Sequence, residues 1–169
     1  MEAVQAIRTR RSIRQYRPEA VPEPLIADIL AAGMSAPSAG NQQPWQFVVI
    51  TDRRLREEIP SFHPYAQMLP DAPVAIAVCG DLRLETFKGY WVQDCSAATQ
   101  NILLAAHACG LGAVWVGIYP KEDRVRSLQA LLVLPAHVVP LALIPRGSPA
   151  ERVPPATRFD PSRVHRDRW

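Results

Sequence analysis

The sequence predicts an α+β sandwich in which a mixed sheet of four or five strands is flanked by helices. Short runs of strand-forming residues alternate with longer stretches whose apolar residues recur at helical spacing. The length of 169 residues is close to the usual size of one domain, and no internal repeat divides the chain. We therefore expect a single domain over residues 1–169, with residues 150–169 as an extended tail.

Five helices are expected, each from its apolar spacing or its end signals. In the first, Val4 and Ile7 should face inward. The second begins at Pro22, because proline is tolerated in the first turn, and ends before Pro37. Asp52 should cap the third. The expected helices cover residues 2–9, 22–36, 53–59, 90–109 and 121–132.

Strand-forming residues lie between these helices. Residues 45–51 are apolar on both faces apart from Gln46, which predicts a covered central strand. Further strands are expected at 10–14, 73–79, 113–118 and 137–144. A linker with four prolines follows over residues 145–155. The tail beyond it has only three large apolar residues, so it should be disordered or lie on a surface supplied by another molecule.

Composition excludes several classes of function. Hydrophobic residues make up 48% and charged residues 21% of the chain, as in ordinary globular proteins. A net charge of +3, with no aromatic residues interleaved among the basic ones, argues against nucleic-acid binding. The apolar stretch 102–119 is interrupted by His107, Gly110 and Gly112, so a helix followed by a buried strand is expected rather than a membrane span.

The cysteines and the amino terminus indicate a cytoplasmic protein. Cys79, Cys95 and Cys109 have neither close pairing nor metal-ligand spacing, and we expect reduced, packed thiols. No histidine lies near Cys95 in sequence, so a packed thiol is favoured over a nucleophile there. The first residues contain no apolar targeting core.

The segment from Thr9 to Trp45 carries the main functional pattern. In an extended chain Arg10, Ser12 and Arg14 share one face, and guanidiniums flanking a hydroxyl suit a phosphate. A proline-bounded loop of small and amide residues follows at 37–44, which suits a flat polar heterocycle. Together they indicate a phosphorylated, ring-bearing cofactor. The alternatives are a surface salt-bridge network for the arginines and an ordinary turn for the loop.

These residues resemble the nitroreductase family of FMN-dependent oxidoreductases. The resemblance rests on Arg10-Arg11-Ser12-Ile13-Arg14 and on Ala36-Pro37-Ser38-Ala39-Gly40-Asn41-Gln42-Gln43-Pro44-Trp45, and it extends to residues 71–73, 93–101 and 111–117 and to the basic tail. It implies a nitroreductase-like three-layer sandwich whose C-terminal tail extends to the partner subunit of a homodimer.

The resemblance also assigns roles to residues of the site. Binding of the phosphate, ribityl and pyrimidine groups of FMN is implied for Arg10, Arg11, Ser12 and Arg14, with Arg158 also on the phosphate. The backbone N–H of Gly117, beside Val116, would face flavin N5, although Gly117 alone is equally a strand terminator. The ring of the partner subunit's FMN would be covered by the residues Pro37, Ser38, Ala39, Asn41 and Gln43.

By this resemblance the chain is an oxidoreductase that takes hydride from NADPH or NADH. It would reduce nitroaromatics, quinones or a related small electrophile by a ping-pong mechanism, without a metal. No G-x-G-x-x-G turn follows a strand, so the nicotinamide cofactor should dock only transiently.

One departure keeps an alternative open. Many family members carry a basic residue in the loop that here covers residues 64–70, which contains no Lys or Arg. Charge stabilisation of the reduced ring would then depend on Arg10 or Arg14. A non-catalytic protein that binds, stores or senses FMN is the second reading. Specialised chemistry such as flavin cleavage or reductive dehalogenation ranks third, because no lid elements are found.

Overall fold

An antiparallel sheet of five strands forms the middle layer of the protein. The computed structural model describes all 169 residues. The sheet order is β1-β2-β5-β3, with β4 also pairing with β5, and every strand pair is antiparallel. The expected parallel component is limited to one isolated bridge between Ser12 and Ala113. The strands are β1 Trp45–Ile50, β2 Val74–Asp81, β3 Gly112–Ala113, β4 Val116–Gly117 and β5 Val138–Gly147.

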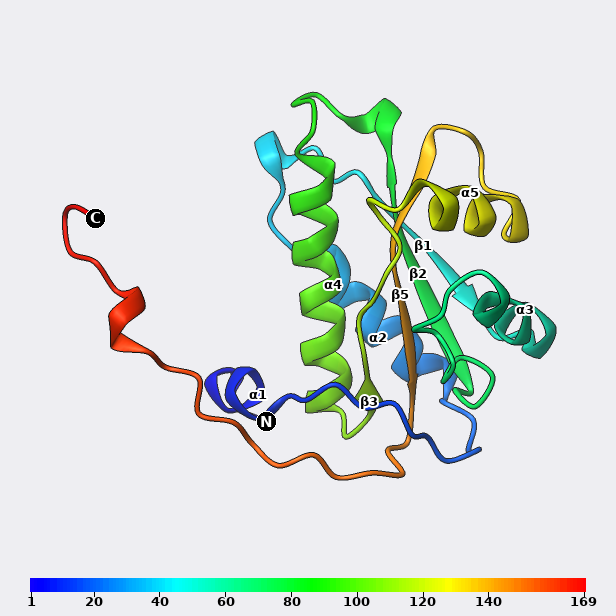
Figure 1. Ribbon diagram of the computed structural model, residues 1–169, viewed down its shortest axis with the longest axis horizontal. Helices are drawn as coiled ribbons and strands as arrows, with labels where there is room; N and C mark the ends of the chain where they lie inside the picture. The colour runs from blue at the N-terminus through cyan, green and yellow to red at the C-terminus, as the bar shows by residue number, and fades with distance from the viewer.

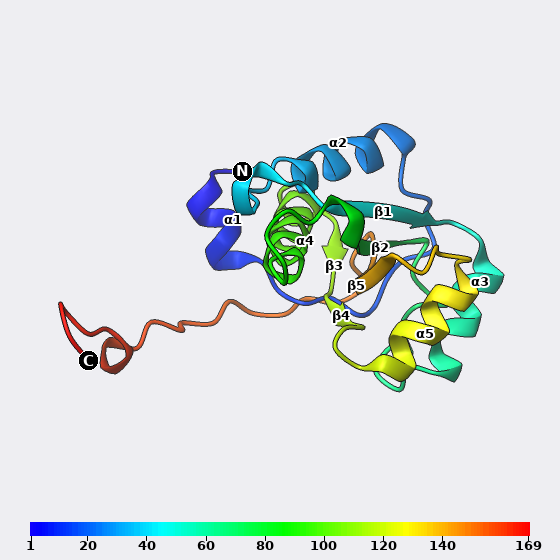
Figure 2. The ribbon, with the colours of Figure 1, turned by 90° about the horizontal axis from the view of Figure 1, so that it is seen from above.

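Helices cover both faces of this sheet, which makes the architecture the expected three-layer sandwich. Helices α2 and α4 lie on one face and α3 and α5 on the other (Figures 1 and 2). Helix α1 lies outside the sandwich, against α4. The helices are α1 Ala3–Thr9, α2 Glu23–Met34, α3 Arg53–Glu58, α4 Trp91–Ala108 and α5 Glu122–Leu131.

The alternation of strand residues divides the core into two parts. Ile76 and Val78 of β2 pack toward α2 and α4, whereas Ala75 and Ala77 pack toward α3 and α5. Helices α2 and α4 approach closely at Gly33, where an added Cβ would lie 2.8 Å from Ile102 Cγ1. The apolar spacing of both helices is therefore explained by burial against one face of the sheet.

Four sequence predictions about the sheet were wrong. The expected strand 10–14 makes only one isolated bridge, from Ser12 to Ala113, and is not a strand of the sheet. The strand 45–50 lies at an edge rather than in the centre, because its apolar faces are covered by helices and hydropathy does not report lateral neighbours. The expected strand 113–118 is divided into β3 and β4. Strand β5 continues to Gly147, into the expected linker, and buries Arg146 completely.

The two ends of the chain expose apolar side chains. Val4 and Ile7 are each 59% exposed, so the prediction that they face inward is wrong; only Ala6 of α1 is buried. The tail leaves the body and projects away from it (Figures 1 and 2). In the tail, Phe159 is 79% and Trp169 is 100% exposed. No helix is long and apolar enough to cross a bilayer.

Candidate cofactor site

A cavity lined by arginines lies between α1 and the beginning of the tail. Its volume is about 680 Å³, and Arg8, Arg10, Arg11 and Arg158 line it without any carboxylate. Burial lowers the pKa of Arg10, and the neighbouring charges of Arg158 and Arg11 lower it further. The cations are thus uncompensated within the chain, which is the electrostatic condition for binding an anion.

Arg11 holds the tail in place. Its Nε donates to the Pro154 carbonyl oxygen at 3.0 Å and its Nη2 to the Ala156 carbonyl oxygen at 3.4 Å. Its Nη1 donates to the carbonyl oxygens of Arg8 and Arg10. All three nitrogens are therefore used by main-chain oxygens, and Arg158 is brought beside Arg10 as a result. A direct contact of Arg11 with a cofactor stays a prediction.

The extended segment 10–14 connects this cavity to a second cleft. Ile13 donates its N–H to the Ala113 carbonyl oxygen at 3.0 Å, so the segment lies along β3. Gly112 permits this approach, because a Cβ there would lie 2.6 Å from Ile13 Cγ2. Arg10 and Arg14 are four positions apart, which corresponds to roughly 13 Å along an extended chain. Arg10 lines the first cavity and Arg14 the second, one at each end of this span.

The second cleft, of about 490 Å³, lies between the loop before β2 and the turn at β4. Gly117 is at its wall, and a Cβ added there would meet nothing within 4 Å. Its backbone φ is not in the left-handed region either. Neither packing nor backbone conformation therefore requires glycine at this position, and the space beside it is open.

His63 is a residue of the site that the sequence did not reveal. It is buried, and its Nε2 donates to the Gly117 carbonyl oxygen at 2.8 Å, while its Nδ1 accepts from the Tyr65 N–H at 3.3 Å. This pattern of partners assigns the proton to Nε2. No local motif marks His63, because its partner lies 54 residues away.

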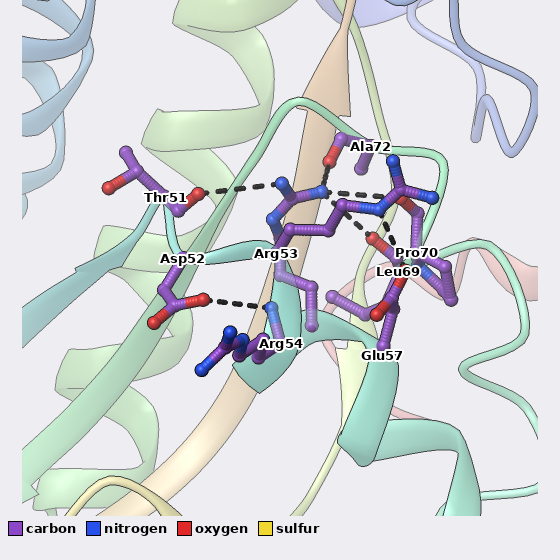
Figure 3. Close-up of polar contacts among 9 residues, drawn as sticks. Thr51, Asp52, Arg53, Arg54, Glu57, Leu69, Pro70 and Ala72 are labelled. Carbon is purple, nitrogen blue, oxygen red and sulfur yellow. Dashed lines mark hydrogen bonds and ion pairs between the residues drawn. The ribbon is translucent and has the colours of Figure 1, made fainter.

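The loop before β2 is held from α3 by a buried arginine. Arg56 donates through Nη1 to the carbonyl oxygens of Leu69, Pro70 and Ala72, and through Nη2 to that of Thr51 (Figure 3). Helix α3 is itself capped as expected, since Asp52 Oδ1 accepts from the Arg54 N–H at 2.8 Å. The cleft wall formed by residues 63–68 is thereby fixed to the body.

The amide loop 37–43 is built around a buried carboxylate. Asp94 accepts from the Ala39 N–H at 2.9 Å and from Gln42 Nε2 at 2.6 Å. Within the loop, Ser38 Oγ accepts from the Gln43 N–H at 3.0 Å, and Gln43 Nε2 donates to Asn41 Oδ1 at 2.9 Å. The small and amide residues of the motif therefore shape the loop itself.

This loop and the arginine cavity are not brought together within one chain. Asp94, near the start of α4, anchors the loop, whereas Thr9 contacts His107 at 2.8 Å near the end of α4. These two α4 residues are 13 positions apart, or roughly 20 Å along the helix. The loop also lies across α4 from β4 (Figure 2). No group of three or more His, Cys, Asp or Glu converges as metal ligands.

The fold and the site define a class of protein, namely an α+β sandwich with an arginine-lined cavity beside an open cleft. A solved structure from Bacteroides thetaiotaomicron, titled "Putative NADH dehydrogenase/NAD(P)H nitroreductase", has a TM-score of 0.95 and 43% identity over 99% of this chain and 98% of that one. A structure from Desulfovibrio desulfuricans, described as a nitroreductase in complex with FMN, has a TM-score of 0.86 and 35% identity over 100% and 98%.

Comparison of sequences points to the same family as these solved structures. A relative from Methanothermobacter thermautotrophicus, named "Putative NADH dehydrogenase/NAD(P)H nitroreductase", is 55% identical over 100% of this chain and 88% of its own length. A family model described as "Nitroreductase family" matches residues 7–63 and 60–148 of this chain. The chain belongs to the nitroreductase family, as its motifs predicted.

Proposed function

We propose that this protein is an FMN-dependent oxidoreductase that takes hydride from NADPH or NADH and reduces a small electrophile. The observation that carries the proposal is the extended segment 10–14, which joins an uncompensated arginine cavity to a cleft with an open backbone position at Gly117. The Arg10 end of this segment suits a phosphate and the Arg14 end suits a ring, and a ribityl chain would join the two groups. The names of similar proteins, which include FMN reductase and NADPH nitroreductase, support the same chemistry.

The residues present fit FMN in their charges and spacing. Arg10 and Arg158 hold the phosphate, Ser12 the groups beside it, and Arg14 the pyrimidine edge. The Gly117 N–H, with Val116 before it, faces the position of N5. Packing and backbone φ would both allow a side chain at position 117. A flavin ring placed against Gly117 explains why the position is nevertheless glycine.

The functional unit is a homodimer in the cytoplasm. One chain separates the loop 37–43 from its own cleft, so the loop is placed to cover the ring bound by a second copy. The exposed apolar residues Val4 and Ile7 of α1, and Phe159 and Trp169 of the tail, supply surface for that copy. The residues of the loop that then reach the ring are Pro37, Ser38, Ala39, Asn41 and Gln43.

FMN, when bound, supplies hydride acceptance at N5 and electron transfer to an acceptor. The chain positions the ring through Gly117 and balances its charge through arginines, and no side chain of the cleft is assigned as general acid. Nitroaromatics and quinones are the proposed acceptors, used in a ping-pong cycle because donor and acceptor share one open cleft.

The proposal is tested by incubating the protein with excess FMN, followed by gel filtration and sedimentation. The expected result is FMN that elutes with a dimer, and steady-state rates with NADPH or NADH and a quinone that give parallel double-reciprocal lines. Release of all FMN on the column would contradict the proposal. Tight FMN retention without reduction by either nicotinamide would instead favour a storage or sensing protein.

A further inference from the structure

The cleft that contains Gly117 lacks a cation from the loop that forms its wall. The residues that line it from this side are His63, Pro64, Tyr65, Gln67 and Met68, and the loop contains no Lys or Arg. From the sequence alone, charge stabilisation of the reduced ring was therefore expected to depend on Arg10 or Arg14.

Helix α5 supplies a second cation to the same cleft. The guanidinium of Arg124 lines the cleft, and its Nη1 donates to the Gly117 carbonyl oxygen at 3.4 Å. Its central carbon lies 5.6 Å from the centre of the Tyr65 ring. These two contacts orient Arg124 between the β4 turn and the loop before β2.

The charge of Arg124 is not neutralised by the chain. Arg124 takes part in no ion pair, whereas Arg126, two positions further along α5, pairs with Glu122 at 3.4 Å. The contacts of Arg124 are a carbonyl oxygen and an aromatic face, which hold a guanidinium in place without cancelling its charge. Its field therefore acts on whatever occupies the cleft.

We propose that Arg124 replaces the missing loop cation and stabilises the negative charge of reduced FMN at its pyrimidine edge. The inference rests on the proposed function. Arg14 and Arg124 stand as the two cations of the cleft, one from the extended segment and one from α5. A positive charge close to the ring favours the reduced anionic form over the oxidised neutral form, so Arg124 raises the reduction potential of bound FMN.

The test compares Arg124→Gln, Arg124→Lys and the control Arg126→Gln as FMN-loaded proteins. The midpoint potential and the dissociation constant of oxidised FMN are measured for each. Gln keeps a side-chain N–H donor but removes the charge, together with the contact of the guanidinium with the Tyr65 ring. We expect Arg124→Gln to weaken binding of reduced FMN about tenfold more than that of oxidised FMN, which lowers a two-electron potential by about 30 mV. Arg124→Lys should restore most of this difference, and Arg126→Gln should leave it unchanged.

An unchanged potential in Arg124→Gln, or an equal shift in Arg126→Gln, would overturn the inference. Thermal melting of the apoproteins checks that each variant folds, and Arg124→Met, which also removes the charge, replaces Arg124→Gln if that variant does not fold. Failure of the inference is distinguishable from failure of the proposed function. In the first case wild-type protein holds FMN and is reduced by NADPH or NADH while the variant keeps its potential. In the second case wild-type protein retains no FMN, and both proposals fail.

Discussion

His63 Nε2 donates a hydrogen bond of 2.8 Å to the carbonyl oxygen of Gly117, and this bond joins the two walls of the proposed flavin cleft. One wall is the loop before β2, which Arg56 holds by donating to three of its carbonyl oxygens. The other wall is the turn at β4. The position of the Gly117 backbone is therefore set by residues far away in sequence.

Removal of this histidine should loosen both walls. His63→Ala leaves the Gly117 carbonyl with only the longer bond from Arg124, and opens a cavity in the wall. We expect the free energy of unfolding to fall by about 1–3 kcal/mol, together with weaker FMN binding. Urea unfolding measures the first effect. The tail variant His165→Ala should change stability by less than about 0.5 kcal/mol, and equal values for both variants would refute the role of His63.

Two glycines near the cleft should respond differently to alanine. Gly117→Ala places a methyl group in open space, so stability should change by less than about 0.5 kcal/mol while FMN affinity falls. Gly112→Ala places its methyl 2.6 Å from Ile13 and should cost about 1–3 kcal/mol through overpacking. Thermal melts with and without FMN separate the two effects. Unchanged FMN affinity in Gly117→Ala would contradict the assignment of the ring to this position.

Arg10→Ala should lower the affinity for FMN without lowering the stability of the apoprotein. The pKa of Arg10 is lowered by burial and then by Arg158 and Arg11, so the folded state disfavours its charge at every pH below that pKa. Near neutral pH the substitution should leave apoprotein stability unchanged or raise it. FMN affinity should fall tenfold or more, which corresponds to about 1.4 kcal/mol. Fluorescence titration with FMN measures this loss, and exposed Arg17→Ala is the control.

A fourth prediction concerns the carboxylate beneath the amide loop. In Asp94→Asn, the new amide faces Gln42 Nε2 as a second donor. Rotation of the Gln42 amide does not relieve this conflict, because its Oε1 already accepts from the Thr86 and Phe87 N–H groups. We expect a loss of about 1–3 kcal/mol in stability and faster proteolysis of residues 37–43. Wild-type stability would show that the loop does not depend on this anchor.

Only one of the three cysteines should react in the folded protein. Burial raises the pKa of the Cys79 thiol to about 12, and burial followed by the neighbouring Cys79 raises the pKa of Cys95. Cys109, expected from the sequence to be packed, is exposed at the end of α4. A thiol reagent near neutral pH should modify one site before unfolding and three after it. Rapid modification of Cys95 would contradict the packing of α4 on β2.

The sequence predicted α2, α4 and α5 well because their apolar spacing reports burial against one face of the sheet. In α1 the same reasoning was wrong, since Val4 and Ile7 are exposed. It could not show that β1 is an edge strand, since hydropathy describes covered faces and not neighbouring strands. It also ended the last strand at residue 144, because the four prolines of residues 145–155 indicated a linker, whereas β5 continues to Gly147 and buries Arg146.

Site residues were predicted where the pattern is local. Arg10, Arg14 and the loop 37–43 belong to contiguous motifs, and Arg158 lines the same cavity as Arg10. Their contacts with FMN stay predictions. His63, Arg56 and Arg124 were not found, because their hydrogen-bond partners, 54, 16 and seven positions away, lie outside their own elements and follow no repeat spacing. Arg124 in particular follows a helix-surface pattern shared with Arg126.

The central claim is that bound FMN accepts hydride in the cleft beside Gly117. The most direct test is the visible spectrum of the purified protein, recorded without oxygen before and after addition of NADPH and then of NADH. We expect flavin bands that bleach with at least one of the two donors. A colourless protein that takes up no added FMN would contradict the claim at its first step, and flavin bands that persist with both donors would contradict its catalytic part.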